Sequence, residues 1–299
     1  MASLKEVKNR IGSVKSTRQI TSAMKMVASA KLHKAQGRIE SMLPYQRKLN
    51  KILTNFLSTD SSFESPYTAV RPVTRLAIVV FSSNSSLCGA FNSNVTRMLE
   101  RTLADYQKLD KENILIYPVG KKVEEAVKKM GYVPQGSYQT LADKPSYAEA
   151  FGLAEVLMKE FLEGKVDRVE LIYHHFKSTG SQILTREEYL PIDLSKVTED
   201  AAADADKGGA ASRGYNNDYI VEPSVEAVIT ELLPKVLSQK IYTVLVDSNA
   251  SEHAARMLAM QTATDNANEL IQDLTKQYNK GRQQAITNEL LDIIGGSFK

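Results

Sequence analysis

The chain has 299 residues, of which 42% are hydrophobic and 24% charged, and its formal net charge is +3. This length allows one or two domains with a sizeable core, and the lack of any run of 18 apolar residues excludes a membrane-spanning helix. A single cysteine, Cys88, excludes an internal disulfide and a cysteine-based metal cluster. Because a helical pattern begins at once, we expect no signal or transit peptide and a reducing, cytoplasmic setting.

The N-terminal segment predicts one long helix from about residue 3 to residue 58, with a bend at Pro44. Apolar residues recur there at spacings of three and four, which is the pattern of a helix that packs on another helix. The stripe consists of Leu4, Val7, Ile11 and Val14 and, after an expected shift of phase, of Ile20, Met24 and Val27. Residues 1–40 contain nine Lys or Arg and two acids, so an acidic partner is expected. A solvated basic face and a nucleic-acid surface are the alternatives.

The middle of the chain, residues 73–192, alternates between strand and helix patterns. The continuous apolar run Leu76–Phe81 predicts a buried strand. Further strands are expected at 114–117, 169–176 and 182–189, with helices at 92–109, 121–130 and 145–163. This alternation predicts a small, mostly parallel sheet covered by helices, Rossmann-like in outline. Residues 193–217 contain few large apolar side chains and are expected to form a mobile loop.

The last segment, residues 222–299, predicts a second long helix with a kink at Pro234. Its apolar stripe consists of Met260, Ala263, Ala267, Leu270, Ile271, Leu274 and Tyr278. Neither terminal helix can bury its stripe alone, so we expect the two to pair as an antiparallel coiled coil. The predicted fold class is therefore α+β. It comprises a long antiparallel two-helix coiled coil, formed by residues 1–60 and 222–299, plus a central Rossmann-like α/β domain.

Residues that could carry chemistry are sparse. No Gly-x-Gly-x-x-Gly follows the first strand, and no Walker-type loop occurs. Gly120 follows a strand and precedes a helix, but its surroundings lack the other glycine and the hydroxyl that would hold phosphates. His174 and His175 are neighbours in a strand and therefore point to opposite faces, and Cys88 is expected to be a buried thiol. We predict no catalytic residue, no cofactor site and no metal site.

Three blocks of the sequence resemble the gamma subunit of F-type ATP synthases. They are Thr17–Lys31, Leu87–Asn92 and the C-terminal block made of Ala254–Ala267, Tyr278–Lys280, Arg282–Gln283 and Ile286–Asp292. The blocks cover both ends of the chain and the start of the middle domain, in the order of the family. Gly281 is a departure, because the family commonly has a larger residue there.

The resemblance implies a central rotor shaft in a bacterial, proton-translocating ATP synthase. In that family the coiled coil lies inside a ring of three alpha and three beta subunits. The middle domain is a foot on the membrane ring of c subunits, beside epsilon. The resemblance also implies a peripheral protein on the cytoplasmic face of the inner membrane, which is not itself an enzyme because ATP chemistry belongs to partner subunits.

The family's contact residues carry over onto matching positions of this chain. The expected contacts to the beta subunits are Met24, Arg256, Arg282, Gln283 and Thr287, and the expected apolar bearing tip consists of Leu290, Leu291, Ile293, Ile294 and Phe298. If Met24 faces Arg256, residues beyond about Asn279 project past Met1 as a single helix.

Two other function classes stay open on the sequence. The first is a nucleotide-dependent enzyme on the Rossmann-like domain, with the helices as dimerisation arms. The second is a coiled-coil scaffold or nucleic-acid binder, for which a steep salt dependence of DNA binding would be diagnostic.

Overall fold

The computed structural model describes residues 3–59, 65–193, 221–222 and 224–297. Apart from Asp193, the segment expected to be a mobile loop lies outside these residues. The chain divides into two compact units. The first consists of residues 1–30 and 256–299, and the second of residues 31–255.

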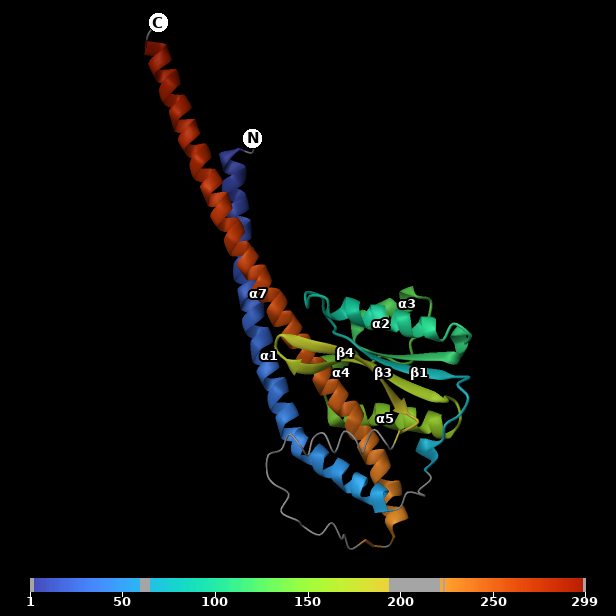
Figure 1. Cartoon of the computed structure of the whole chain (residues 1–299). Coiled ribbons are helices and arrows are strands. Elements are labelled where there is room, and N and C mark those ends of the chain that lie inside the picture. Colours follow the sequence, from blue (N-terminus) through green and yellow to red (C-terminus); the bar gives the residue numbers. More distant parts are fainter. Residues whose placement is uncertain (1–2, 60–64, 194–220, 223, 298–299) are drawn as a thin grey trace. The chain divides into compact units, whose positions relative to one another are not determined.

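The first unit is built from two helices, which are the start of α1 (Leu4–Thr59) and the end of α7 (Val225–Ser297). In this unit they lie side by side and run in opposite directions (Figure 1). A capping box starts α1, since the Ser3 hydroxyl accepts from the Glu6 amide at 3.2 Å and the Ser3 amide donates to the Glu6 carboxylate at 2.8 Å. The predicted pairing of the chain ends is confirmed.

The second unit contains a four-stranded sheet in the order β2-β1-β3-β4. Its strands are β1 (Leu76–Phe81), β2 (Ile114–Val119), β3 (Arg168–Ser178) and β4 (Ser181–Leu190). β1 pairs in parallel with both β2 and β3, and β4 folds back antiparallel to β3. The mostly parallel sheet is the one that the alternation of β-branched runs with helical patterns predicted.

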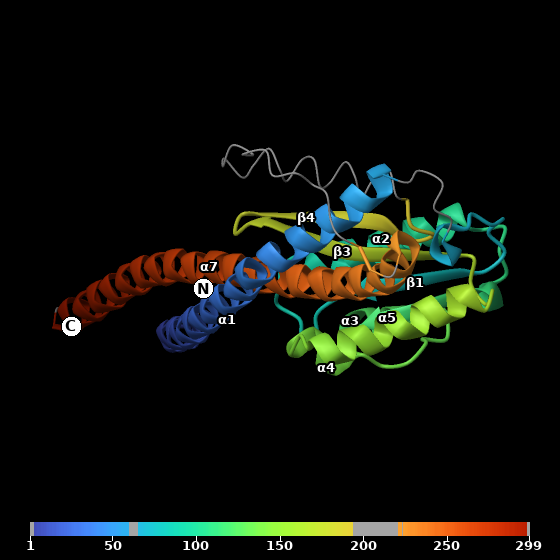
Figure 2. The same cartoon turned by 90° about the horizontal axis from the view of Figure 1, so that it is seen from below.

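Helices cover both faces of this sheet (Figure 2). They are α2 (Phe91–Asp105), α3 (Lys121–Lys129), α4 (Gln139–Asp143) and α5 (Tyr147–Leu162), with short 3-10 turns at Pro66–Thr68 and Lys111–Asn113. Every side chain of β1 is buried. Ala77, Val79 and Phe81 join the core with α5 and the 237–245 part of α7, whereas the alternate residues join the core with α2 and α3.

A smaller cluster joins the two long helices inside the second unit. Leu53 and Phe56 of α1 pack with Ile229 and Leu233 of α7. Both helices continue through a proline here, α1 through Pro44 and α7 through Pro234.

Candidate partner-binding surface of the paired helices

One stripe of α1 packs against one stripe of α7 in the first unit. The stripe residues are buried or half-buried and follow one another at alternating spacings of three and four, which is the heptad pattern of a coiled coil. On α1 they are Leu4, Val7, Ile11, Val14, Arg18, Thr21, Lys25 and Ala28, and on α7 they are Met260, Thr264, Ala267, Ile271, Leu274, Tyr278 and Gly281.

Two close contacts define the register of this seam. The hydroxyls of Thr21 and Thr264 lie 2.8 Å apart, and a Cβ added to Gly281 would lie 3.1 Å from Cδ2 of Leu4. Both contacts fit a single register, which places Met24 opposite Gln261. The register predicted from Met24 facing Arg256 is therefore wrong by five residues, or about 7.5 Å along the helix axis.

The predicted shift of phase on α1 is also wrong. Ile20 and Val27, which were expected in the seam, are 60% and 57% exposed. The seam instead continues in phase through Arg18, Thr21 and Lys25. It does so because polar partners on α7 satisfy these side chains.

We call these partners and their counterparts the polar layer, which consists of Arg18, Thr21, Lys25, Gln261, Thr264 and Asn268. Arg18 Nη1 donates to Asn268 Oδ1 at 3.3 Å, and Lys25 Nζ donates to Gln261 Oε1 at 2.8 Å. Beside the polar layer lies an open groove whose lining residues are Arg18, Gln19, Ser22, Thr264 and Asn268. The two helices are thus joined here by hydrogen bonds, and polar groups extend to the surface.

The outward surface of α1 in this unit is both apolar and basic. Ile20, Met26 and Val27 are each more than half exposed, whereas Met24 is half-buried. Exposed apolar groups of this size next to charged ones are typical of protein-binding surfaces. Arg256, the other predicted contact near Met24, is half-buried on α7.

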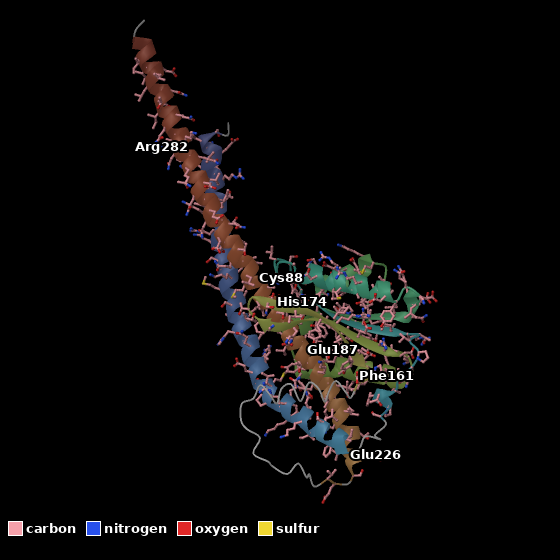
Figure 3. All side chains as sticks on the ribbon, viewed as in Figure 1. Cys88, Phe161, His174, Glu187, Glu226 and Arg282 are labelled. Atoms are coloured by element: carbon pink, nitrogen blue, oxygen red, sulfur yellow. The ribbon has the colours of Figure 1, made fainter. Side chains whose placement is uncertain are left out.

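Beyond Gly281, α7 extends past the start of α1 (Figure 1). Figure 3 shows Arg282 at this level of α7. Arg282, Gln283 and Thr287 are exposed, and the Thr287 hydroxyl donates to the Gln283 carbonyl at 2.9 Å.

The expected apolar tip is exposed where it is described. The exposed fractions are 54% for Leu290, 61% for Leu291, 68% for Ile293 and 52% for Ile294, and Phe298 lies outside the described residues. The described part of the chain thus leaves this apolar end uncovered.

The sheet unit does not offer a phosphate cradle at Gly120. The first three amides of α3 already donate to the protein, from Lys121 to Asn84 Oδ1 at 2.9 Å, from Lys122 to the Ser83 carbonyl at 3.1 Å and from Val123 to Ser82 Oγ at 3.0 Å. A Cβ at Gly120, whose φ is +110°, would lie 2.3 Å from the Ser82 carbonyl oxygen. This glycine therefore serves close packing of two backbones, and the amides that would bind a phosphate at a helix start are occupied.

Structural partners surround the strand histidines His174 and His175 and the cysteine of this unit. The His174 ring stacks on Phe91 with centroids 4.3 Å apart, and burial lowers the pKa of His174 to about 4. His175 Nδ1 lies 2.6 Å from Asp247 Oδ2, and this hydrogen bond raises the pKa of His175. Cys88 is buried, as predicted, and its sulfur accepts a hydrogen bond from Nδ2 of the Asn92 side chain at 3.2 Å (Figure 3).

Within the described residues, no group of three or more His, Cys, Asp or Glu side chains is arranged to hold a metal ion. Nor does any helix in the described part combine the length and hydropathy that a membrane crossing requires.

Comparison with known proteins gives a consistent result. The family model described as ATP synthase matches residues 3–298. The chain is 71% identical to the ATP synthase gamma chain of Bacteroides fragilis, over 99% of both chains, and 67% identical to that of Bacteroides thetaiotaomicron, over the whole of both.

Solved structures share the fold. A chain of the Euglena gracilis mitochondrial ATP synthase matches with a TM-score of 0.64 at 23% identity, over 98% of this chain and 92% of that one. A central-stalk chain of the Tetrahymena thermophila mitochondrial ATP synthase matches with a TM-score of 0.58 at 24% identity, over 82% of this chain and 99% of that one. With a family model spanning nearly its full length and relatives that are two-thirds identical or more, the chain belongs to the ATP synthase gamma chain family.

Proposed function

We propose that the chain is the central rotor shaft of a proton-translocating F-type ATP synthase. It couples rotation of the membrane c-ring to conformational changes at the catalytic beta subunits, and it has no catalytic residue of its own. Its partners are the ring of three alpha and three beta subunits, epsilon and the c-ring. The observation that carries the proposal is the pairing of the chain ends into one seam whose outer faces differ.

The physical argument rests on this asymmetry. A shaft inside a three-fold ring turns different surfaces of its own towards three identical subunits, so each orientation of the shaft stabilises a different conformation in each subunit. On the described part of the shaft, the exposed apolar residues Ile20, Met26 and Val27 of α1 differ from the polar residues Thr262, Asp265 and Asn266 of α7, which are exposed at about the same level of the seam. A turn of the shaft therefore exchanges one set of contacts for another.

Specific contacts follow from the positions of the side chains. Met24 and Arg256 lie on opposite helices about five residues apart in register, so they would meet neighbouring parts of a beta-subunit loop. Arg282, Gln283 and Thr287 would contact beta higher on the shaft. The exposed end formed by Leu290, Leu291, Ile293 and Ile294, together with Phe298, would turn in an apolar collar, since an aqueous setting for so many apolar groups is unfavourable.

The complex to which the family belongs is associated with a membrane. For this chain we propose a peripheral location on the cytoplasmic face of the bacterial inner membrane. This location would leave the shaft in water, consistent with the charged outer surface of α1.

The test is assembly and coupling. A tagged full-length chain should co-purify with alpha and beta subunits, and the reconstituted complex should pump protons when it hydrolyses ATP. ATP or NAD binding by the isolated chain, lost on substitution of Gly120, would instead favour a nucleotide-dependent enzyme, and the occupied amides of α3 argue against that reading.

A further inference from the structure

A basic groove lies between α2 and the edge strand β4 in the sheet unit. Its lining residues are Asn94, Arg97, Met98, Arg101 and Leu184, and its volume is about 190 Å³. Met98 and Leu184 are partly buried against the core below and form an apolar floor. The groove is distant in sequence from the proposed contacts to the beta subunits, and the sequence patterns did not reveal it.

Arg97 and Arg101 are exposed on one face of α2, one turn apart, so their Cβ atoms lie about 6 Å from each other. In the part of the chain that the structure describes, neither guanidinium forms an ion pair. Glu100 is also exposed on α2, yet it pairs with neither of them.

Glu170 of β3, Glu188 of β4 and Asp105 of α2 are already engaged by other arginines. Arg186 pairs with Glu170 at 2.7 Å and with Asp105, and Arg168 pairs with Glu188 at 3.1 Å. The fold thus pairs Arg168 and Arg186 with its own acids and leaves the exposed Arg97 and Arg101 without an ion pair among the described residues. Guanidinium groups bind carboxylates with paired hydrogen bonds, which favours an acidic partner over a neutral one.

We propose that this groove docks an acidic segment of another subunit of the assembled complex. One apolar side chain of that segment would rest on Met98 and Leu184, and two carboxylates beside it would bind Arg97 and Arg101. The inference rests on the proposed function for the identity of the complex, and it adds a contact that does not involve the paired helices.

The test uses the intact complex purified in its membrane. A photoreactive benzoylphenylalanine replaces Asn94, which lines the groove without belonging to the arginine pair. After illumination, the crosslinked peptide is mapped by mass spectrometry. We expect a partner segment that carries at least two Asp or Glu residues around an apolar residue.

Charge reversal then tests the chemistry. R97E/R101E should lower the crosslink yield at least tenfold, whereas the control K129E/K144E, which reverses two exposed lysines elsewhere on the same unit, should leave it within twofold. A crosslink to lipid, to nucleic acid or to a neutral or basic segment, no crosslink, or a yield that survives R97E/R101E would overturn the proposal. Co-purification of alpha and beta is measured first, so that failure of the proposed function is seen separately as failure of assembly.

Discussion

Removal of one buried leucine from the seam should loosen the paired helices selectively. Leu274 is 4% exposed, whereas Leu270, one turn earlier on the same helix, is 39% exposed. Burial of a leucine contributes about 1.5–3 kcal/mol, and a cavity adds to the loss when the site cannot collapse. In a two-helix seam, water and neighbouring side chains can fill part of the cavity that a removed leucine leaves. We therefore expect Leu274→Ala to lower the free energy of unfolding of the paired helices by about 2–3 kcal/mol, towards the lower end of the range for core leucines. Leu270→Ala should cost about 1 kcal/mol or less.

The assay is amide hydrogen exchange on the full-length chain, read for residues 4–28 and 258–281 separately from the sheet. A loss of 2–3 kcal/mol should speed exchange in the seam by about 30- to 150-fold under conditions in which the helices reclose faster than their open amides exchange, because the rate then follows the opening equilibrium. The strands β1 and β3 should be unaffected. Equal effects of Leu274→Ala and Leu270→Ala, or no change in the seam with either, would refute the assignment of the heptad positions.

Three further predictions concern the sheet unit and the coupling surface. Gly120→Ala should destabilise the sheet unit by more than about 2 kcal/mol in chemical denaturation, because the positive φ of Gly120 and its contact with the Ser82 backbone exclude a Cβ. The control Gly152→Ala, at an open helical position, should be neutral or stabilising by up to about 1 kcal/mol. Equal effects of the two substitutions would contradict the reasoning. The pair of His175 with Asp247 should stabilise the fold fully below the ordinary histidine pKa of about 6.5, and this contribution should vanish as pH rises through the raised pKa of His175 in the folded state. Since the ring is half exposed, the free energy of unfolding should drop by at most about 1 kcal/mol between pH 6 and pH 9. An Asp247→Asn variant that kept the full drop would disprove this assignment. Met24→Lys should leave assembly intact while lowering proton pumping per ATP hydrolysed, because it adds a charge at the proposed beta contact, and unchanged pumping and turnover would contradict the contact.

The sheet unit was largely predictable because its signals are local. The run Leu76–Phe81 is buried on both faces and is identified as a strand without knowledge of its partners. The other predicted strands and helices agree in order and type, but the short helix Gln139–Asp143 was not predicted. Boundaries were less accurate. The helix expected to reach residue 109 ends at Asp105, where the following Tyr106 turns its hydroxyl towards Glu170 at 2.6 Å. That contact joins residues 64 apart, which no local pattern records.

The seam was predicted as an element but not in detail. A seam position occupied by Arg18, Thr21 or Lys25 does not appear in a pattern of apolar residues. The apolar pattern therefore predicted the exposed Ile20 and Val27 as seam residues instead. On α7 the adjacent pair Leu270 and Ile271 fits the stripe equally well in sequence. Only the partner helix decides between them.

Contacts between distant side chains were outside the reach of the sequence. His175 and Asp247 are 72 residues apart, and the polar layer joins residues more than 230 apart. Their charges and hydrogen-bonding groups are visible in the sequence, but their pairing depends on the register of helices and strands. The candidate contacts at Arg282, Gln283 and Thr287 remain predictions that rest on the family resemblance and on their exposure.

Observation of rotation in single complexes tests the central claim most directly. The full-length chain is assembled with alpha and beta subunits, and a bead is attached to a cysteine introduced at exposed Lys108, since the native Cys88 is buried and would not react. During ATP hydrolysis the bead should turn in one direction and pause three times in each revolution, once for each beta subunit. A bead that only fluctuates while ATP hydrolysis continues at the normal rate would contradict the claim that this chain is the rotating shaft.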